Sequence, residues 1–163
     1  MAKTKEEKTN VMRTLEQKNI SYRAFTYPHE EGIAVDGVTV AKSLGQDPEQ
    51  VFKTLVARGA SGGIYVFVIP VAENLDLKKA AKAVGEKSVE MVHVKEINGL
   101  TGYVRGGCSP VGMKKQYPTV FHETAEIIDE IMVSAGRIGY QVACRPEDLI
   151  ELVGGSLADI VTD

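Results

Sequence analysis

A glycine-rich segment in the second half of the chain is the stretch of sequence best suited to chemistry. It covers residues 102–112 and contains four glycines and Pro110. Glycine has no Cβ to keep a bound group away from the backbone, and proline stiffens the chain where it leaves the loop. Successive backbone N–H groups in such a loop can converge on an anion or on a developing oxyanion. The structural alternative is a wide bulge or an edge loop of a sheet.

Lys53 is the second candidate, because it is the one charged residue in the apolar segment of residues 51–56. The neighbouring side chains favour burial. The lysine therefore either points to solvent from an exposed strand face, or enters a pocket where its ammonium meets a phosphate, a carboxylate or a developing oxyanion. The pattern of residues leaves both alternatives open.

Cys108 lies inside the glycine-rich segment and raises the possibility of a thiol nucleophile. The chain also has three histidines, His29, His93 and His122, and a cysteine that the fold places beside a histidine can become a thiolate. No local pattern fixes a histidine near Cys108, however, and a single cysteine in a tight loop is usually a small apolar filler. Both interpretations remain open.

Other cofactor chemistry has no sequence pattern to support it. The two cysteines, Cys108 and Cys144, are far apart and show no CxxC or Cys/His spacing, so we expect no disulfide framework and no metal site. The glycines in residues 134–139 and at 154–155 do not follow the strand-loop-helix pattern of nucleotide-binding motifs. We therefore expect no cofactor.

The surrounding patterns predict one α+β domain over residues 1–163. Helical periodicity predicts an amphipathic helix over residues 4–19, with Thr4 and Glu7 as a capping box, and further helical segments at residues 38–44, 76–84, 94–97 and 146–153. Strand patterns cover residues 22–27, 51–57, 64–71, 89–92, 119–121, 127–133 and 140–143. A glycine-rich turn between the second and third strands predicts a hairpin, and Asp47-Pro48 predicts a turn. We expect a curved mixed sheet, mostly antiparallel, or a partial barrel, flanked by helices.

Composition and charge limit the class of protein. The 163 residues are 44% hydrophobic and 25% charged, as in an ordinary folded domain. The polar first ten residues lack a signal sequence, and no apolar run approaches the ~20 residues of a membrane span, so we expect a cytoplasmic protein without a membrane partner.

The charged residues are unevenly distributed along the chain. Residues 78–115 hold eight basic residues against three acidic ones, and residues 116–163 hold nine acidic residues against two basic ones. The basic part is either a face for a polyanion or an ordinary solvated surface.

In combination, several segments resemble the YbaK family, which is related to the editing domain inserted in bacterial prolyl-tRNA synthetases. They are Phe52-Lys53-Thr54-Leu55, Leu77-Lys78-Lys79-Ala80-Ala81, Gly102-Tyr103, Gly106 to Lys115, and Leu157-Ala158-Asp159-Ile160. The resemblance implies an α+β fold and an aminoacyl-tRNA deacylase that acts on the acceptor end of tRNA, without metal or cofactor. It also implies prolyl-tRNA synthetase as a candidate partner, and no DNA.

The resemblance also assigns roles to individual residues. It implies that Lys53 is the residue on which activity depends, and that the segment from Gly106 to Pro110 holds the ester carbonyl and the terminal adenosine. The implied catalytic residues are Lys53, Gly106, Gly107 and Ser109. The implied substrate-binding residues are Tyr27, Asp36, Thr54, Cys108, Pro110, Ser134 and Gly136. Asp36-Gly37 stands where some relatives carry an aromatic residue, and Cys108 stands where relatives often carry an isoleucine.

The reaction implied by the resemblance is removal of mischarged cysteine from tRNA(Pro), and also from tRNA(Cys), with the thiol of the substrate as the nucleophile. Three alternatives stay open. The protein could remove alanine or another small amino acid by attack of water, it could be a non-catalytic module that binds the tRNA end or a synthetase, or it could be a Cys108-dependent hydrolase of an unrelated ester.

Overall fold

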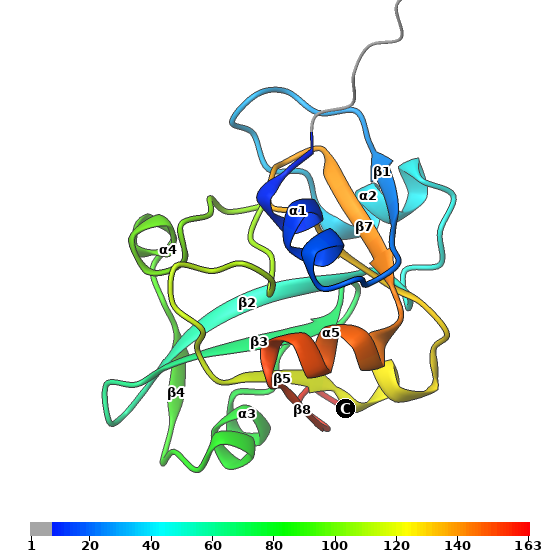
Figure 1. Ribbon diagram of the computed structural model, residues 1–163. Helices are drawn as coiled ribbons and strands as arrows, with labels where there is room; N and C mark the ends of the chain where they lie inside the picture. Colours follow the sequence, from blue (N-terminus) through cyan, green and yellow to red (C-terminus); the bar gives the residue numbers. More distant parts are fainter. Residues whose placement is uncertain (1–7) are drawn as a thin grey trace, which may run out of the picture.

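The computed structural model describes residues 8–163, which form helices and strands in mixed order (Figure 1). The helices are α1 (Asn10–Gln17), α2 (Gly37–Ser43), α3 (Leu77–Val84), α4 (Val94–Thr101), α5 (Pro146–Val153) and the 3₁₀ helix η1 (Glu123–Ile127). The strands are β1 (Arg23–Thr26), β2 (Phe52–Gly59), β3 (Ile64–Pro70), β4 (Val89–Met91), β5 (Thr119–His122), β6 (Ile131–Ser134), β7 (Tyr140–Cys144) and β8 (Ser156–Ala158).

The strands form two sheets, and the predicted α+β class is confirmed. The larger sheet has the order β4-β2-β3-β5-β8 and the smaller one the order β1-β7-β6. The pairings β3 with β5 and β5 with β8 are parallel, and the other pairings between strands are antiparallel. Within residues 8–163 the sheets do not close into a barrel, because the only pairing between them is a single bridge from Met132 of β6 to Val51, the residue before β2.

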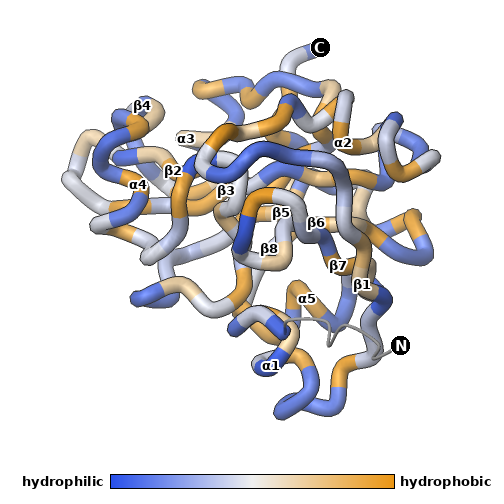
Figure 2. Tube along the Cα trace, turned by 90° about the horizontal axis from the view of Figure 1, so that it is seen from above, coloured by the Kyte–Doolittle hydropathy of each residue, from blue (hydrophilic) through white to orange (hydrophobic). Residues whose placement is uncertain are grey.

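Three apolar clusters hold these layers together, and the smallest joins Ala41 of α2 to Val51, Val71, Met132 and Ala143. The largest one fills the space between the two sheets and is covered by α1 and α5 (Figure 1); its fully buried members include Leu15, Phe52, Phe121, Val133 and Leu149. The second lies on the other face of the larger sheet under α3 and includes Phe67, Ile69, Ala80 and Ile160. Figure 2 shows apolar and hydrophilic residues alternating at short intervals along the chain, as expected where most elements have one buried and one exposed face.

Several predicted elements change in extent. Helix α1 is capped by Thr9, whose hydroxyl accepts a 3.2 Å hydrogen bond from the Met12 N–H; the predicted capping box of Thr4 and Glu7 lies outside the described residues. The predicted helical turn at 94–97 is a full helix, α4. The predicted strand at 127–133 begins only at Ile131, because η1 extends to Ile127 and residues 128–130 form a loop. Strand β8 was not predicted, since three residues carry too little pattern to show alternation.

No helix in residues 8–163 combines the length and the apolar composition that crossing a membrane requires.

Candidate active site

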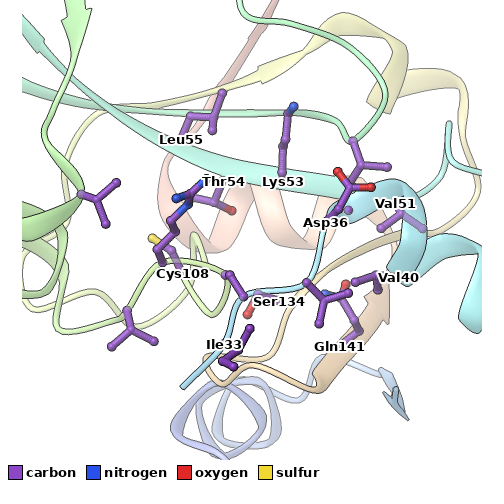
Figure 3. A pocket seen from close by; sticks show the side chains of 18 of the residues that line it. Ile33, Asp36, Val40, Val51, Lys53, Thr54, Leu55, Cys108, Ser134 and Gln141 are labelled. Carbon is purple, nitrogen blue, oxygen red and sulfur yellow. The ribbon is translucent and has the colours of Figure 1, made fainter. Parts of the chain in front are cut away.

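A pocket of about 1100 Å³ opens where the two sheets meet. Val51 and residues 52–55 of β2 form one wall, Ser134 of β6 and Gln141 of β7 form another, and the loop at 32–36 and the glycine-rich segment close the sides (Figure 3). Helix α4 adds Val94, Lys95 and Asn98 at its first turns. The pocket therefore draws on segments that are more than a hundred residues apart in the sequence.

The structure brings most of the expected site residues together. The pocket is lined by seven of them: Tyr27, Asp36, Lys53, Thr54, Gly106, Cys108 and Ser134. Gly107, Ser109, Pro110 and Gly136 are not among its lining residues. Ser109 is fully buried, and its hydroxyl accepts a 3.2 Å hydrogen bond from the Val111 N–H. Ser109 therefore shapes the segment from behind the pocket wall and offers no hydroxyl to a bound substrate.

The glycines of this segment allow close packing on both sides. Gly106 has a φ of +87°, and a Cβ at this position would lie 2.7 Å from the Ala34 Cβ. A Cβ on Gly107 would lie 3.0 Å from the backbone nitrogen of Ile138. Carbon atoms do not approach so closely without movement, so the segment fits between its neighbours because these two residues lack side chains. Gly106 is exposed and borders the pocket, whereas Gly107 is buried.

Lys53 lies at the rim of the pocket and not against the glycine-rich segment. Phe52 and Val56 pack in the core cluster that contains Cys108, so strand alternation places Thr54 on that face and Lys53 on the other. Figure 3 shows the Lys53 side chain rising from β2 on the side opposite Ser134. Its ammonium has no carboxylate within 4.0 Å among residues 8–163.

The environment of Lys53 lowers the pKa of its ammonium. The side chain is half-buried, and loss of hydration disfavours the charged form. The carboxylates of Asp36 and Glu73 act in the opposite direction and raise the pKa, without cancelling the effect of burial. The result is a cation that is poorly hydrated and not ion-paired, which strengthens its field on a bound group.

Replacing Asp36 by asparagine is expected to lower the pKa of Lys53 further. Asp36 also caps α2 by accepting a 3.2 Å hydrogen bond from the Thr39 N–H, and asparagine caps a helix as well as aspartate does, so the change removes charge and keeps the cap. The measurement is a ¹³C NMR titration of the Lys53 Cε signal. Asp47→Asn, at a turn outside the pocket, is the control and should leave the titration unchanged. A Lys53 pKa that stays constant or rises in Asp36→Asn would contradict this electrostatic account.

Cys108 does not have the surroundings of a nucleophile. Its side chain is 8% exposed, and burial raises the pKa of the thiol to about 11. The thiolate is therefore a minor form near neutral pH. None of the three histidines lines the pocket. Within residues 8–163, no three side chains of His, Cys, Asp or Glu converge as metal ligands.

The predicted basic part of the chain is divided between two places. Lys95 and Arg105 are exposed and line the pocket. Lys79 lies on α3 and forms ion pairs with Asp159 at 3.1 Å and Asp163 at 2.8 Å, which raise its pKa. Lys95 and Arg105 are therefore the cations of this part of the chain that border the pocket.

Sequence reasoning missed several lining residues. Ile33, Val94 and Val104 are at least half exposed at the pocket, and Gln141 is buried there. The polar Gln141 within the apolar strand 140–144 was a signal that could have been used. Val94 and Lys95 line the pocket only because of where α4 packs, and no local sequence pattern predicts that position.

The comparison with known families decides the identity of the domain. The sequence profile of the aminoacyl-tRNA editing domain matches residues 34–152, a range that includes Lys53 and the whole glycine-rich segment. The chain belongs to this family. The editing domain is thus the unit that forms the pocket, apart from Tyr27, Gly32 and Ile33 at its N-terminal side.

Individual relatives of the editing domain agree with this assignment. A protein of Enterococcus faecalis (strain ATCC 700802 / V583), named as a candidate Cys-tRNA(Pro)/Cys-tRNA(Cys) deacylase, EbsC, is 47% identical over 163 residues, covering 99% of each chain. A solved structure described as a candidate trans-editing enzyme for prolyl-tRNA synthetase is 26% identical, covers 94% of this chain and 95% of its own, and has a TM-score of 0.81. The structure of the hypothetical protein APE2540 shares the fold, with 23% identity, a TM-score of 0.82 and coverage of 93% and 99%.

Proposed function

We propose that this editing domain is a cytoplasmic, trans-acting deacylase that releases cysteine from Cys-tRNA(Pro) and Cys-tRNA(Cys) without a cofactor. The observation that carries the proposal is one pocket that combines the half-buried Lys53 ammonium with the glycine-rich wall at Gly106. The similarity to the Enterococcus faecalis protein over the full length of both chains supports the substrate.

The mechanism relies on positioning and on the substrate's own thiol. The cysteine sulfur attacks the ester carbonyl carbon, the C–O bond to the ribose breaks, and the thiol proton passes to the ribose oxygen that leaves. The products are a cyclic thioester of cysteine and uncharged tRNA. Alignment of an intramolecular nucleophile contributes ~7 to 11 kcal/mol, and one oxyanion donor ~2.7 to 4 kcal/mol, so the site needs no strong base of its own.

The acceptor end of the tRNA is expected to enter past Lys95 and Arg105. Both cations border the pocket, and a phosphodiester chain that leads to the aminoacylated ribose would pass close to them. Residues 116–163 hold nine acidic residues against two basic ones, and this negative charge disfavours contact of that part of the chain with the tRNA body. We therefore propose that prolyl-tRNA synthetase supplies part of the tRNA specificity in a ternary complex. Failure to detect such a complex at near-physiological salt by analytical ultracentrifugation would count against this partner.

The function is tested with purified protein and a panel of aminoacyl-tRNAs. We expect rapid loss of cysteine from Cys-tRNA(Pro) and Cys-tRNA(Cys), and slow loss of alanine from Ala-tRNA(Pro). Faster release of alanine would point to hydrolysis by water and overturn the assignment of cysteine. Binding of tRNA without release of any amino acid would identify a non-catalytic module instead.

Replacing Cys108 by alanine is expected to leave the rate of cysteine release within about a factor of three, since its thiol stays protonated near neutral pH. The measurement is kcat/KM on Cys-tRNA(Pro), together with labelling by iodoacetamide. The second cysteine is also buried, and the pKa of its thiol is raised to about 12, so Cys144→Ala serves as the matched control for loss of a buried thiol. An inactive Cys108→Ala beside an active Cys144→Ala would support a thiol enzyme and refute the mechanism above.

A further inference from the structure

Strand β2 has an unpaired edge where it borders the pocket. Strand β3 covers one edge of β2 from Phe52 to Arg58. On the other edge, β4 pairs with Ala57, Arg58 and Gly59, and β6 forms a single bridge to Val51, the residue before β2. Between these contacts, the edge that includes Thr54 has no neighbouring strand among residues 8–163.

The register of the hairpin fixes which backbone groups face this gap. The Val71 N–H donates to the Val51 C=O at 2.8 Å, and the Gly59 N–H donates to the Gly63 C=O at 2.8 Å, so the odd-numbered residues of β2 point toward β3. The polar backbone groups of the even-numbered residues therefore point the other way. One of these groups, the Val56 C=O, accepts a hydrogen bond from the Val92 N–H at 3.2 Å.

Thr54 combines three polar atoms without a partner. Its N–H and C=O face the gap and take part in no hydrogen bond within residues 8–163. Its hydroxyl oxygen is buried and likewise has no hydrogen-bond partner in that range. An unsatisfied polar group of this kind costs about 1–3 kcal/mol, and such groups in folded proteins normally have a partner. Thr54 lines the pocket, so a bound molecule can supply the partner of its backbone groups, whereas the hydroxyl oxygen is enclosed by protein atoms and takes no part in the pairing.

We propose that the backbone of Thr54 pairs with the aminoacyl group of the substrate as a residue of a neighbouring strand would. An aminoacyl ester has the same N–Cα–C=O arrangement as a residue in a strand. Its α-ammonium donates to the Thr54 C=O, and the Thr54 N–H donates to the ester carbonyl oxygen, as in a hydrogen-bonded pair of an antiparallel sheet. This inference rests on the proposed function, because it needs an aminoacyl ester as the ligand.

The pairing has two chemical consequences. The Thr54 N–H becomes a donor to the oxyanion that develops when the ester carbonyl is attacked, and it does so from a strand that β3 holds in place. The contacts also involve atoms that every L-aminoacyl group shares. Discrimination among amino acids is then left to the side chains around the pocket, and the β2 edge selects the aminoacyl class as a whole.

Binding is tested by ¹⁵N NMR with a stable analogue, adenosine that carries L-alanine on a 3′-amino group. We expect the Thr54 amide signal to move strongly on titration, while the amide of Tyr65, which lies opposite Ala57 in the hairpin and does not line the pocket, serves as the internal control and moves little. The matching lactyl analogue has a hydroxyl in place of the α-ammonium and should bind at least about tenfold more weakly. Equal affinities for the two analogues, or an unchanged Thr54 signal on saturation, would overturn the inference.

Catalysis is tested by replacing the amide between Lys53 and Thr54 by an ester, which removes the Thr54 N–H and keeps every side chain. We expect kcat for Cys-tRNA(Pro) to fall by about 10²-fold or more and KM to rise much less, because the N–H already contacts the ester carbonyl in the bound substrate and binds the oxyanion more strongly in the transition state. Retention of the thermal midpoint shows that the fold persists. An ester variant with normal kcat overturns the inference and leaves the proposed function standing, whereas an unmodified protein that releases no amino acid overturns both.

Discussion

Replacing Lys53 by alanine is expected to lower kcat/KM for cysteine release from Cys-tRNA(Pro) by about 10²-fold or more, because a cation that stabilises developing negative charge is lost. The ammonium is half-buried and has no ion-pair partner within 4.0 Å among residues 8–163, so its field is not neutralised by a contact within the protein. The measurement is single-turnover deacylation, with the uncatalysed loss of the ester subtracted.

The matched control for Lys53→Ala is Lys78→Ala, which removes a lysine from α3, away from the pocket. It should keep the rate of the unaltered protein. Both variants are expected to give the far-ultraviolet circular dichroism of the native fold, since neither ammonium anchors an element of the core. Full activity of Lys53→Ala would show that the catalytic centre lies elsewhere in the pocket.

Replacing Gly106 by alanine is expected to lower both activity and stability. At a φ of +87° an L-residue other than glycine costs roughly 1–2 kcal/mol. The new Cβ would also lie 2.7 Å from the Ala34 Cβ and 3.1 Å from the Ala34 Cα, so the loop at 32–36 must move away from the glycine-rich segment. Both segments line the pocket, and we expect a loss of at least about tenfold in kcat/KM, since small displacements of positioning groups have effects of this size.

Gly62→Ala separates backbone strain from the steric conflict. Gly62 has a similar φ of +95° and lies in the turn of the β2–β3 hairpin, where a new Cβ would have no other atom within 4 Å. This variant should lose stability by a comparable backbone cost and keep its activity. Urea unfolding and deacylation rates are measured for both variants. Equal activity of the two variants would show that the contact between Gly106 and Ala34 has no role in shaping the site.

Lys53 shows how far local sequence could predict the site. A single charge in an apolar strand run was visible in the sequence, and the structure places it in the lining of the pocket. The side of β2 from which the Lys53 side chain projects could not be predicted. The pattern at 51–56 is apolar on both faces, so alternation alone did not state that Thr54 faces the cluster with Cys108 while Lys53 projects from the other side.

Ser109 and Gly107 show the same limit within the glycine-rich segment. The sequence indicated a loop in which the backbone approaches a neighbour, and the contacts at Gly106 and Gly107 agree with that expectation. Which residues face the ligand depends on how the loop folds over the turn at 135–139. Gly106 is exposed there, whereas Ser109 is turned inward to bond its own loop.

The sequence by itself determined the α+β class, most of the helices and strands, and the hairpin of β2 and β3, because capping residues, turn residues and periodic apolar positions act over a few neighbouring residues. Membership of the editing family also follows from the sequence, through its match to the family profile. The tertiary structure decided that β4 and β6 leave a gap beside β2, that the loop at 32–36 and α4 close the pocket, and that the strands divide into two sheets. These features depend on pairings between distant segments, and their stability comes from buried contacts that exist only after the chain has folded.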